Sequence, residues 1–155
     1  MILAFKRTMI SIVIIFSAAA SSQEVLTTNA IFNDAFIAYG NKVEECTNHV
    51  KTNTVPFPTT SWFSSLTNEM QKRVVLYMSL SNRMNCSEAA RLKATDKAQQ
   101  LSSQEQSKVE FFLEATDLSQ YSEGLDLDRV KELQAIYSLP FNSFTVARDL
   151  GLWTE

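Results

Sequence analysis

The sequence predicts an all-α fold, a small helical bundle of five or six helices with one disulfide, preceded by a signal peptide. The 155-residue chain holds three Gly and three Pro, too few for the many tight turns of an all-β fold. Apolar residues recur at steps of three and four in several segments, which is the spacing of one helix face. The two cysteines follow an N-terminal segment typical of exported proteins.

The N-terminal segment has the parts of a signal peptide. A basic pair at 6–7 precedes the apolar run 9–16, and Ala18 and Ala20 fit the small residues that signal peptidase needs. We expect cleavage after Ala20, with cleavage after Ser22 as the alternative. A membrane anchor is the other interpretation, but the apolar run is shorter than the roughly 20 residues that span a bilayer.

The domain assignment follows from this leader. Residues 1–20 form a cleaved signal peptide and 21–155 a single all-α domain, as expected for a chain of this length. The protein is then exported to the periplasm or the extracellular space. We expect no membrane association after cleavage, because no second apolar run is long enough to span a bilayer.

The two cysteines, Cys46 and Cys86, are expected to form a disulfide, since two cysteines in an oxidising compartment most simply pair. The bond would close a loop of about 40 residues and stabilise the fold by about 3–4 kcal/mol. Two free buried thiols are the alternative. Redox catalysis is disfavoured because the chain has no Cys-x-x-Cys pair.

The first predicted helix, 27–51, has the cleanest amphipathic pattern. Its apolar positions alternate steps of four and three and are Phe32, Phe36, Tyr39, Val43, Cys46 and Val50. Thr28 or Asn29 caps its start. Gly40 weakens the helix by about 1 kcal/mol relative to Ala without breaking it.

The connection that follows, 52–65, contains two prolines that favour an extended backbone. Its aromatic residues Phe57, Trp62 and Phe63 are unusual for a loop. Either they fold back over the end of the helical core, or they form a contact patch for a partner protein.

The longest helical pattern is 67–98, with Thr67 as its N-cap. One face carries Leu66, Met70, Val74, Tyr77, Leu80 and Met84. Asn85, Cys86 and Ser87 are poor helix formers in a row. The pattern therefore predicts either one long helix or two helices that meet at Asn85.

A helical hairpin is expected next. Its first helix, 103–117, begins with a capping box of Ser102 and Glu105. Its second helix, 127–138, begins at Asp126 or Asp128 and ends before Pro140. The inward residues are expected to be Val109, Phe112, Leu113 and Thr116 in the first helix and Leu127, Val130, Leu133, Ile136 and Tyr137 in the second.

A last short helix is predicted near the C-terminus. Asn142 or Ser143 caps its start and Gly151 ends it. Its core face holds Phe144, Ala147 and Leu150. Trp153 is expected to pack back on the core.

The charge balance disfavours nucleic acid as a partner. The formal charge of the chain is −3, and removal of Lys6 and Arg7 with the leader leaves 12 basic against 17 acidic residues, or −5. Nucleic-acid binding requires clustered Lys and Arg that neutralise phosphates, and no such run occurs.

Motifs for metal or catalytic chemistry are weak, and we predict no cofactor and no metal. An EF-hand that starts at Asp117 would need Gly at its sixth position, where Ser122 stands. His49 is the single histidine, so a zinc site lacks its usual ligands. The chain has no Gly-x-Ser-x-Gly and no glycine-rich phosphate loop. Asn85-Cys86-Ser87 matches the N-glycosylation pattern, and a chance match is the alternative.

The sequence therefore favours a non-enzymatic function, the binding of another protein, as an inhibitor, an immunity protein or an adaptor. A mildly acidic domain suits a basic partner. The candidate contact residues are the aromatic Phe57, Trp62 and Phe63 and the acidic Glu44, Glu45, Asp117, Glu123, Asp126 and Asp128.

Two other functions stay open at this point. The Phe and Met residues could line a cavity for an apolar small molecule, in which case a hollow of roughly 300 Å³ or more is expected. An enzyme would need a cleft that brings His49 together with an acid and a hydroxyl.

Overall fold

The computed structural model describes residues 27–153 of the chain. This part folds into helices without strands, which confirms the all-α class. The predicted signal peptide, 1–20, lies outside the described residues. The helices are α1 (Ala30–Thr52), α2 (Ser61–Ser65), α3 (Asn68–Ala98), α4 (Ser103–Leu113), α5 (Ser119–Ser122), α6 (Leu127–Ile136) and α7 (Ser143–Asp149).

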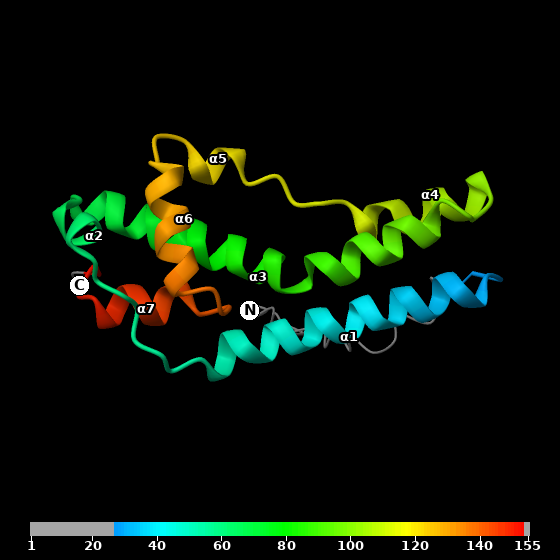
Figure 1. Cartoon of the computed structure of the whole chain (residues 1–155), viewed down its shortest axis with the longest axis horizontal. Coiled ribbons are helices and arrows are strands. Elements are labelled where there is room, and N and C mark those ends of the chain that lie inside the picture. Colours follow the sequence, from blue (N-terminus) through cyan, green and yellow to red (C-terminus); the bar gives the residue numbers. More distant parts are fainter. Residues whose placement is uncertain (1–26, 154–155) are drawn as a thin grey trace, which may run out of the picture.

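The frame of the molecule is an antiparallel pair, α1 and α3, which lie side by side along the long axis (Figure 1). Cys46 of α1 and Cys86 of α3 form the predicted disulfide, with Cα atoms 6.0 Å apart. Helix α3 is continuous through Asn85, and its 31 residues span about 46 Å. Packing and the covalent bond to α1 thus outweigh the poor helix propensity of this segment.

One end of the molecule holds a core rich in aromatic side chains, which we call the aromatic core. It lies where α2, α6 and α7 surround the first half of α3 (Figure 1). Its buried residues are Phe57, Phe63, Val74, Val75, Met78, Val130, Leu133, Tyr137, Phe141, Val146, Ala147 and Leu152.

The other end holds a smaller core between α1, the second half of α3 and α4, which we call the alanine core. Its buried residues are Phe32, Ala35, Ala94, Ala98, Leu101, Val109 and Leu113. The small alanines allow the helix backbones to approach closely, so this end is narrow.

The helix boundaries agree closely with the predicted caps. The side chain of Asn29 accepts from Phe32 N, and Thr67 accepts from Met70 N. Ser102 and Glu105 form both halves of the capping box. Asp126 caps α6 and Asn142 caps α7, which decides two of the open alternatives. Gly151 follows α7 at φ 67°, where only glycine is free of strain.

Several expected inward positions face solvent instead. Leu127, Ile136, Phe112 and Phe144 are exposed because α4, α6 and α7 each bury only one narrow side against α3. Helix α4 ends at Leu113, so Thr116 lies outside it. Trp153 is also exposed and stacks on Phe144, with 6.0 Å between ring centroids, rather than on the core.

Two short helices, α2 and α5, occur in segments that the sequence analysis treated as loops. Each has about one turn. No helix within residues 27–153 is long and apolar enough to cross a membrane.

Candidate interaction surfaces

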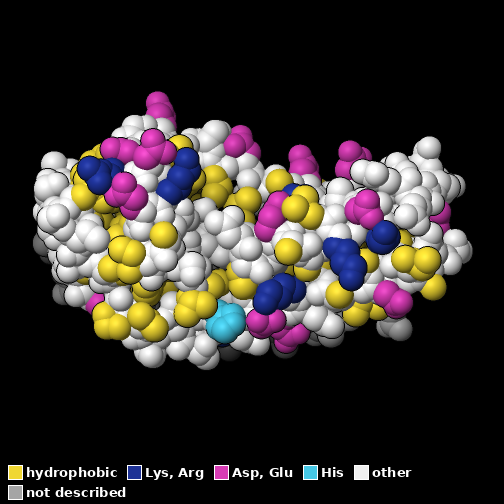
Figure 2. Space-filling model, in the orientation of Figure 1, with side chains coloured by type: hydrophobic (Ala, Val, Ile, Leu, Met, Phe, Trp, Pro, Cys, Tyr) yellow, Lys and Arg dark blue, Asp and Glu magenta, His cyan; other side chains and the backbone are white. Residues whose placement is uncertain are grey.

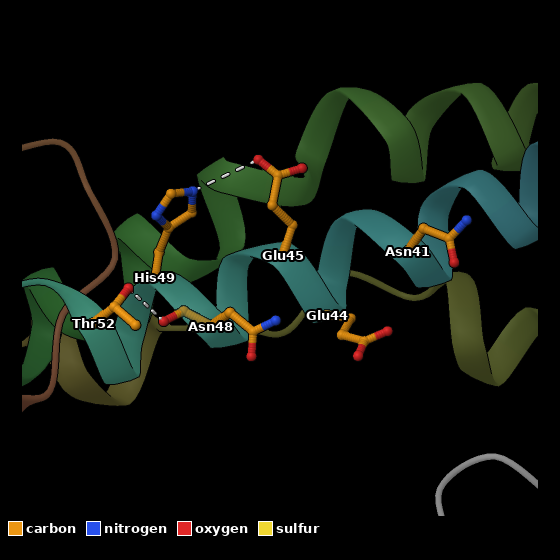
Figure 3. A pocket seen from close by; sticks show the side chains of 6 residues that line it. All are labelled: Asn41, Glu44, Glu45, Asn48, His49 and Thr52. Carbon is orange, nitrogen blue, oxygen red and sulfur yellow. Dashed lines mark hydrogen bonds and ion pairs between the residues drawn. The ribbon is translucent and has the colours of Figure 1, made fainter.

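The single histidine lies on the outer face of α1, near the end of the helix (Figure 3). His49 Nε2 is 3.6 Å from Glu45 Oε1, and the same carboxylate accepts a hydrogen bond from Lys42 at 2.8 Å. This hydrogen bond and the charge of Lys42 lower the pKa of Glu45. The hydroxyl of Thr52 donates to the Asn48 carbonyl at 2.9 Å, away from the imidazole.

This face of α1 is open and polar. Its side chains, Asn41, Glu44, Glu45, Asn48, His49 and Thr52, all belong to one helix. Figure 3 shows Glu44 and Asn48 directed away from Glu45 and His49. A single helix surface is convex, so these groups do not enclose a substrate. Within residues 27–153, no cluster of three or more His, Cys, Asp or Glu is arranged to hold a metal ion.

A groove of about 230 Å³ lies between α1 and α3. It is lined by Ile31, Asp34, Ala35, Ala38, Lys93 and Lys97. Neither this groove nor the outer face of α1 is lined by Phe or Met, the residues that the carrier hypothesis assigns to a ligand cavity.

The six acidic candidates fall into two separate groups. Glu44 and Glu45 lie on α1, whereas the other four lie along the path from α4 to α6. In Figure 1 the segment that carries these four residues, 117–128, lies on the side of α3 away from α1. The fold therefore does not unite the six residues in one contact surface.

The acidic charge is concentrated along the path from α4 to α6. Residues 105–128 contain seven acids and one base, Lys108, for a net charge of −6. The exposed acids Glu110, Glu114, Asp117, Glu123, Asp126 and Asp128 form what we call the acidic ridge. Figure 2 shows acidic side chains along the upper edge of the molecule, where these elements lie.

Part of the acidic ridge has structural roles. Asp117 accepts from the backbone N–H of Ser119 at 2.8 Å and from its hydroxyl at 2.9 Å, which lowers the pKa of Asp117. Asp126 is the N-cap of α6, and Asp128 pairs with Lys131 at 3.2 Å. These three carboxylates are thus explained by local structure.

The aromatic candidates fold back over the end of the helical core, which is the first of the two predicted alternatives. Phe57 and Phe63 lie in the aromatic core, and Trp62 is half-buried against it. The rings of Phe57 and Phe63 are 5.1 Å apart. Assignment of Phe57 and Phe63 to a contact patch is therefore corrected, because Phe57 of the extended connection and Phe63 of α2 are both buried in the core.

A different apolar surface lies beside these buried rings. Residues 52–68 and 133–147 are two long runs without any charged side chain. The two runs touch, since Tyr137 Oη donates to Val55 O at 2.8 Å and Asn53 Nδ2 donates to Pro140 O at 3.1 Å.

We call the exposed part of these two runs the uncharged face. It presents Val55, Ile136 and Leu139, whose exposed fractions are 53%, 67% and 48%. In Figure 2, hydrophobic side chains gather at the lower left, where α6 ends and the connection before α2 passes in front of α7. The helical periodicity placed Ile136 inward, but the absence of charge in both runs was a signal for this surface.

The backbone that presents the uncharged face is held from below. Asn82 of α3 is buried, and its Nδ2 donates to Tyr137 O at 2.7 Å and to Leu139 O at 3.3 Å. Its carbonyl oxygen accepts from Gln134 Nε2 at 2.8 Å. The loop after α6 therefore has satisfied polar groups and a fixed position.

No family model, no curated protein and no solved structure matches this chain.

Proposed function

We propose that this protein acts by non-covalent binding of another protein, and that the uncharged face is the contact surface. The observation that carries the proposal is the exposure of Val55, Ile136 and Leu139 in two runs of sequence that hold no charged residue. The centres of protein interfaces are depleted in charge and rich in apolar groups. A prearranged surface also binds with a smaller loss of conformational entropy.

We also propose that binding takes place after export to the periplasm or the extracellular space, with cleavage after Ala20. The disulfide and the lack of a membrane-spanning helix within residues 27–153 are compatible with this location. N-terminal sequencing of the protein from the exported fraction checks it. A mature chain that begins at Ser21 is expected, and a full-length chain in the cytoplasm would contradict the proposal.

The binding proposal is tested with the double substitution Ile136→Ser and Leu139→Ser in the mature protein. Both side chains are exposed, so the free energy of unfolding should change by only about 0.5 kcal/mol per site. Captured partner from the native exported fraction should fall by about tenfold or more, the effect of removing binding hot spots. Quantitative mass spectrometry of the captured proteins measures this.

The matched control is Ile37→Ser with Leu92→Ser, two exposed aliphatic residues on α1 and α3. It removes the same kind of apolar surface from the other end of the molecule. Capture should persist in the control. Equal loss in both pairs, or equal retention in both, would contradict the assignment of the uncharged face.

A further inference from the structure

Helix α4 carries an aromatic face that the described part of the chain leaves largely exposed. Phe111 is 79% exposed and Phe112 43% exposed. Their rings meet edge to face with centroids 5.7 Å apart, and Phe112 packs edge-on against Phe36 of α1 at 6.1 Å. Phe36 in turn stacks on the fully buried Phe32 at 5.4 Å. The exposed ring is thus the outer member of an aromatic series anchored in the alanine core.

Two acidic residues flank Phe111 in the sequence, near the C-terminal end of α4, where they do not stabilise the helix. Glu110 lies in the last turn of α4 and Glu114 is its C-cap. The C-terminal end of a helix carries partial negative charge, so carboxylates there are unfavourable. Within residues 27–153, neither side chain takes part in an ion pair.

The guanidinium of Arg91 reaches this end of α4 but does not neutralise Glu110 or Glu114. Arg91 of α3 donates to the Leu113 carbonyl at 2.6 Å, and its guanidinium is already paired with Glu88 at 2.7 Å. An exposed Phe between two unpaired acids therefore has no explanation in the stability of the fold. Departures from local rules of this kind are expected at functional sites.

The charge around the aromatic face indicates what covers it. Helix α4 and its C-cap carry the acids Glu105, Glu110 and Glu114 against one base, Lys108, for a net charge of −2. We propose that Phe111 and Phe112, with Glu110 and Glu114, form a second docking site for a partner that presents an apolar pocket bordered by Lys or Arg. The site extends the proposed function to two contact surfaces, but it rests on α4 alone and does not require the uncharged face.

The test is selection of a random peptide library, displayed on phage, against the mature protein. Peptides that combine basic and apolar residues should be enriched. Their affinity for Phe111→Ser should fall by about tenfold or more, as for loss of a binding hot spot. Glu110→Gln with Glu114→Gln should slow association and weaken its dependence on salt.

The matched control is Asp34→Asn with Glu44→Gln, which removes two exposed acids from α1. Binding of the selected peptides should be unchanged in this control and in the Ile136→Ser, Leu139→Ser variant, so failure at one surface is separable from failure at the other. Circular dichroism and urea unfolding verify that every variant is folded. Selected peptides without basic residues, or equal binding by Phe111→Ser, would overturn the proposal.

Discussion

The aromatic core and the alanine core solve the same packing problem in opposite ways. In the aromatic core, loops and short helices place bulky rings between elements, as Phe57, Tyr137 and Phe141 show with centroid separations of 5.1–5.8 Å. In the alanine core, the small Ala94 and Ala98 of α3 are buried together with one large ring, Phe32 of α1. Phe111 of α4 lies outside this core.

The difference teaches that exposure of large apolar residues has two origins in this protein. At the aromatic end, Ile136 and Leu139 are exposed because the neighbouring rings of Tyr137 and Phe141 occupy the core. At the alanine end, Phe111 is exposed because α4 contributes only Val109 and Leu113 to a thin interface. The two surfaces lie beside different cores, at different ends of the molecule, which makes them open to separate experiments.

The largest expected effect breaks the aromatic core. Phe141→Ala removes a ring that is 1% exposed and that contacts both Phe57 and Tyr137. The free energy of unfolding should fall by about 3–5 kcal/mol, the cost of truncating a buried Phe. Urea denaturation followed by circular dichroism measures the loss. A loss below about 1 kcal/mol would show that this end is loosely packed.

The second prediction concerns the covalent link between α1 and α3. The double substitution Cys46→Ser and Cys86→Ser should lower the free energy of unfolding by about 3–4 kcal/mol, because the open loop gains entropy in the unfolded chain. Reduction of the wild type by dithiothreitol should give a similar loss. Hydrogen exchange should rise more in α1 than in α6 or α7, and a uniform rise would show that the two ends unfold together.

The alanine core should respond to added volume. Ala94 is fully buried between helices, so Ala94→Leu should lower the free energy of unfolding by about 1–3 kcal/mol through overpacking. Thermal and urea unfolding measure this. The control is Ala38→Val, which adds two methyl groups at an exposed position and should have a smaller effect. An unchanged Ala94→Leu variant would contradict the close approach of helices at this end.

The smallest expected effect is a dependence on pH at the alanine end. Hydrogen bonds from Ser102 and from the backbone of Thr28 lower the pKa of Glu105 below its ordinary value. Its contribution to stability is therefore complete above the unfolded-state pKa and is lost as the pH falls through the lower folded-state pKa. As the pH falls, the Glu105→Gln variant should lose less stability than the wild type does. Urea unfolding at a series of pH values measures this. Identical pH profiles would contradict this role.

Local features of the fold were predictable from the sequence because they depend on neighbouring residues. The caps at Asn29, Thr67 and Ser102 rest on side-chain bonds within one helical turn. The disulfide between Cys46 and Cys86 was predictable because a chain with two cysteines has one simple pairing.

The surfaces were harder to predict because they depend on contacts between distant segments. Periodicity placed Ile136 and Phe112 on apolar helix faces, but the width of the face that α3 covers decides which of them is buried. Similarly, Phe57 and Phe63 became core residues because Tyr137 and Phe141 arrive from the other end of the chain. In the sequence, only the two charge-free runs, 52–68 and 133–147, and the acidic stretch 105–128 indicated where these surfaces lie.

The order of the two cores along the chain sets the order in which they can form. The alanine core and the disulfide are complete once Leu113 is available, whereas the aromatic core needs residues up to Leu152. Because a chain is synthesised from its N-terminus, one half has all of its residues while the other half still lacks α6 and α7. Until those helices arrive, Phe57, Phe63 and Met78 have no cover, and this is the interval in which the protein is most exposed to aggregation and proteolysis.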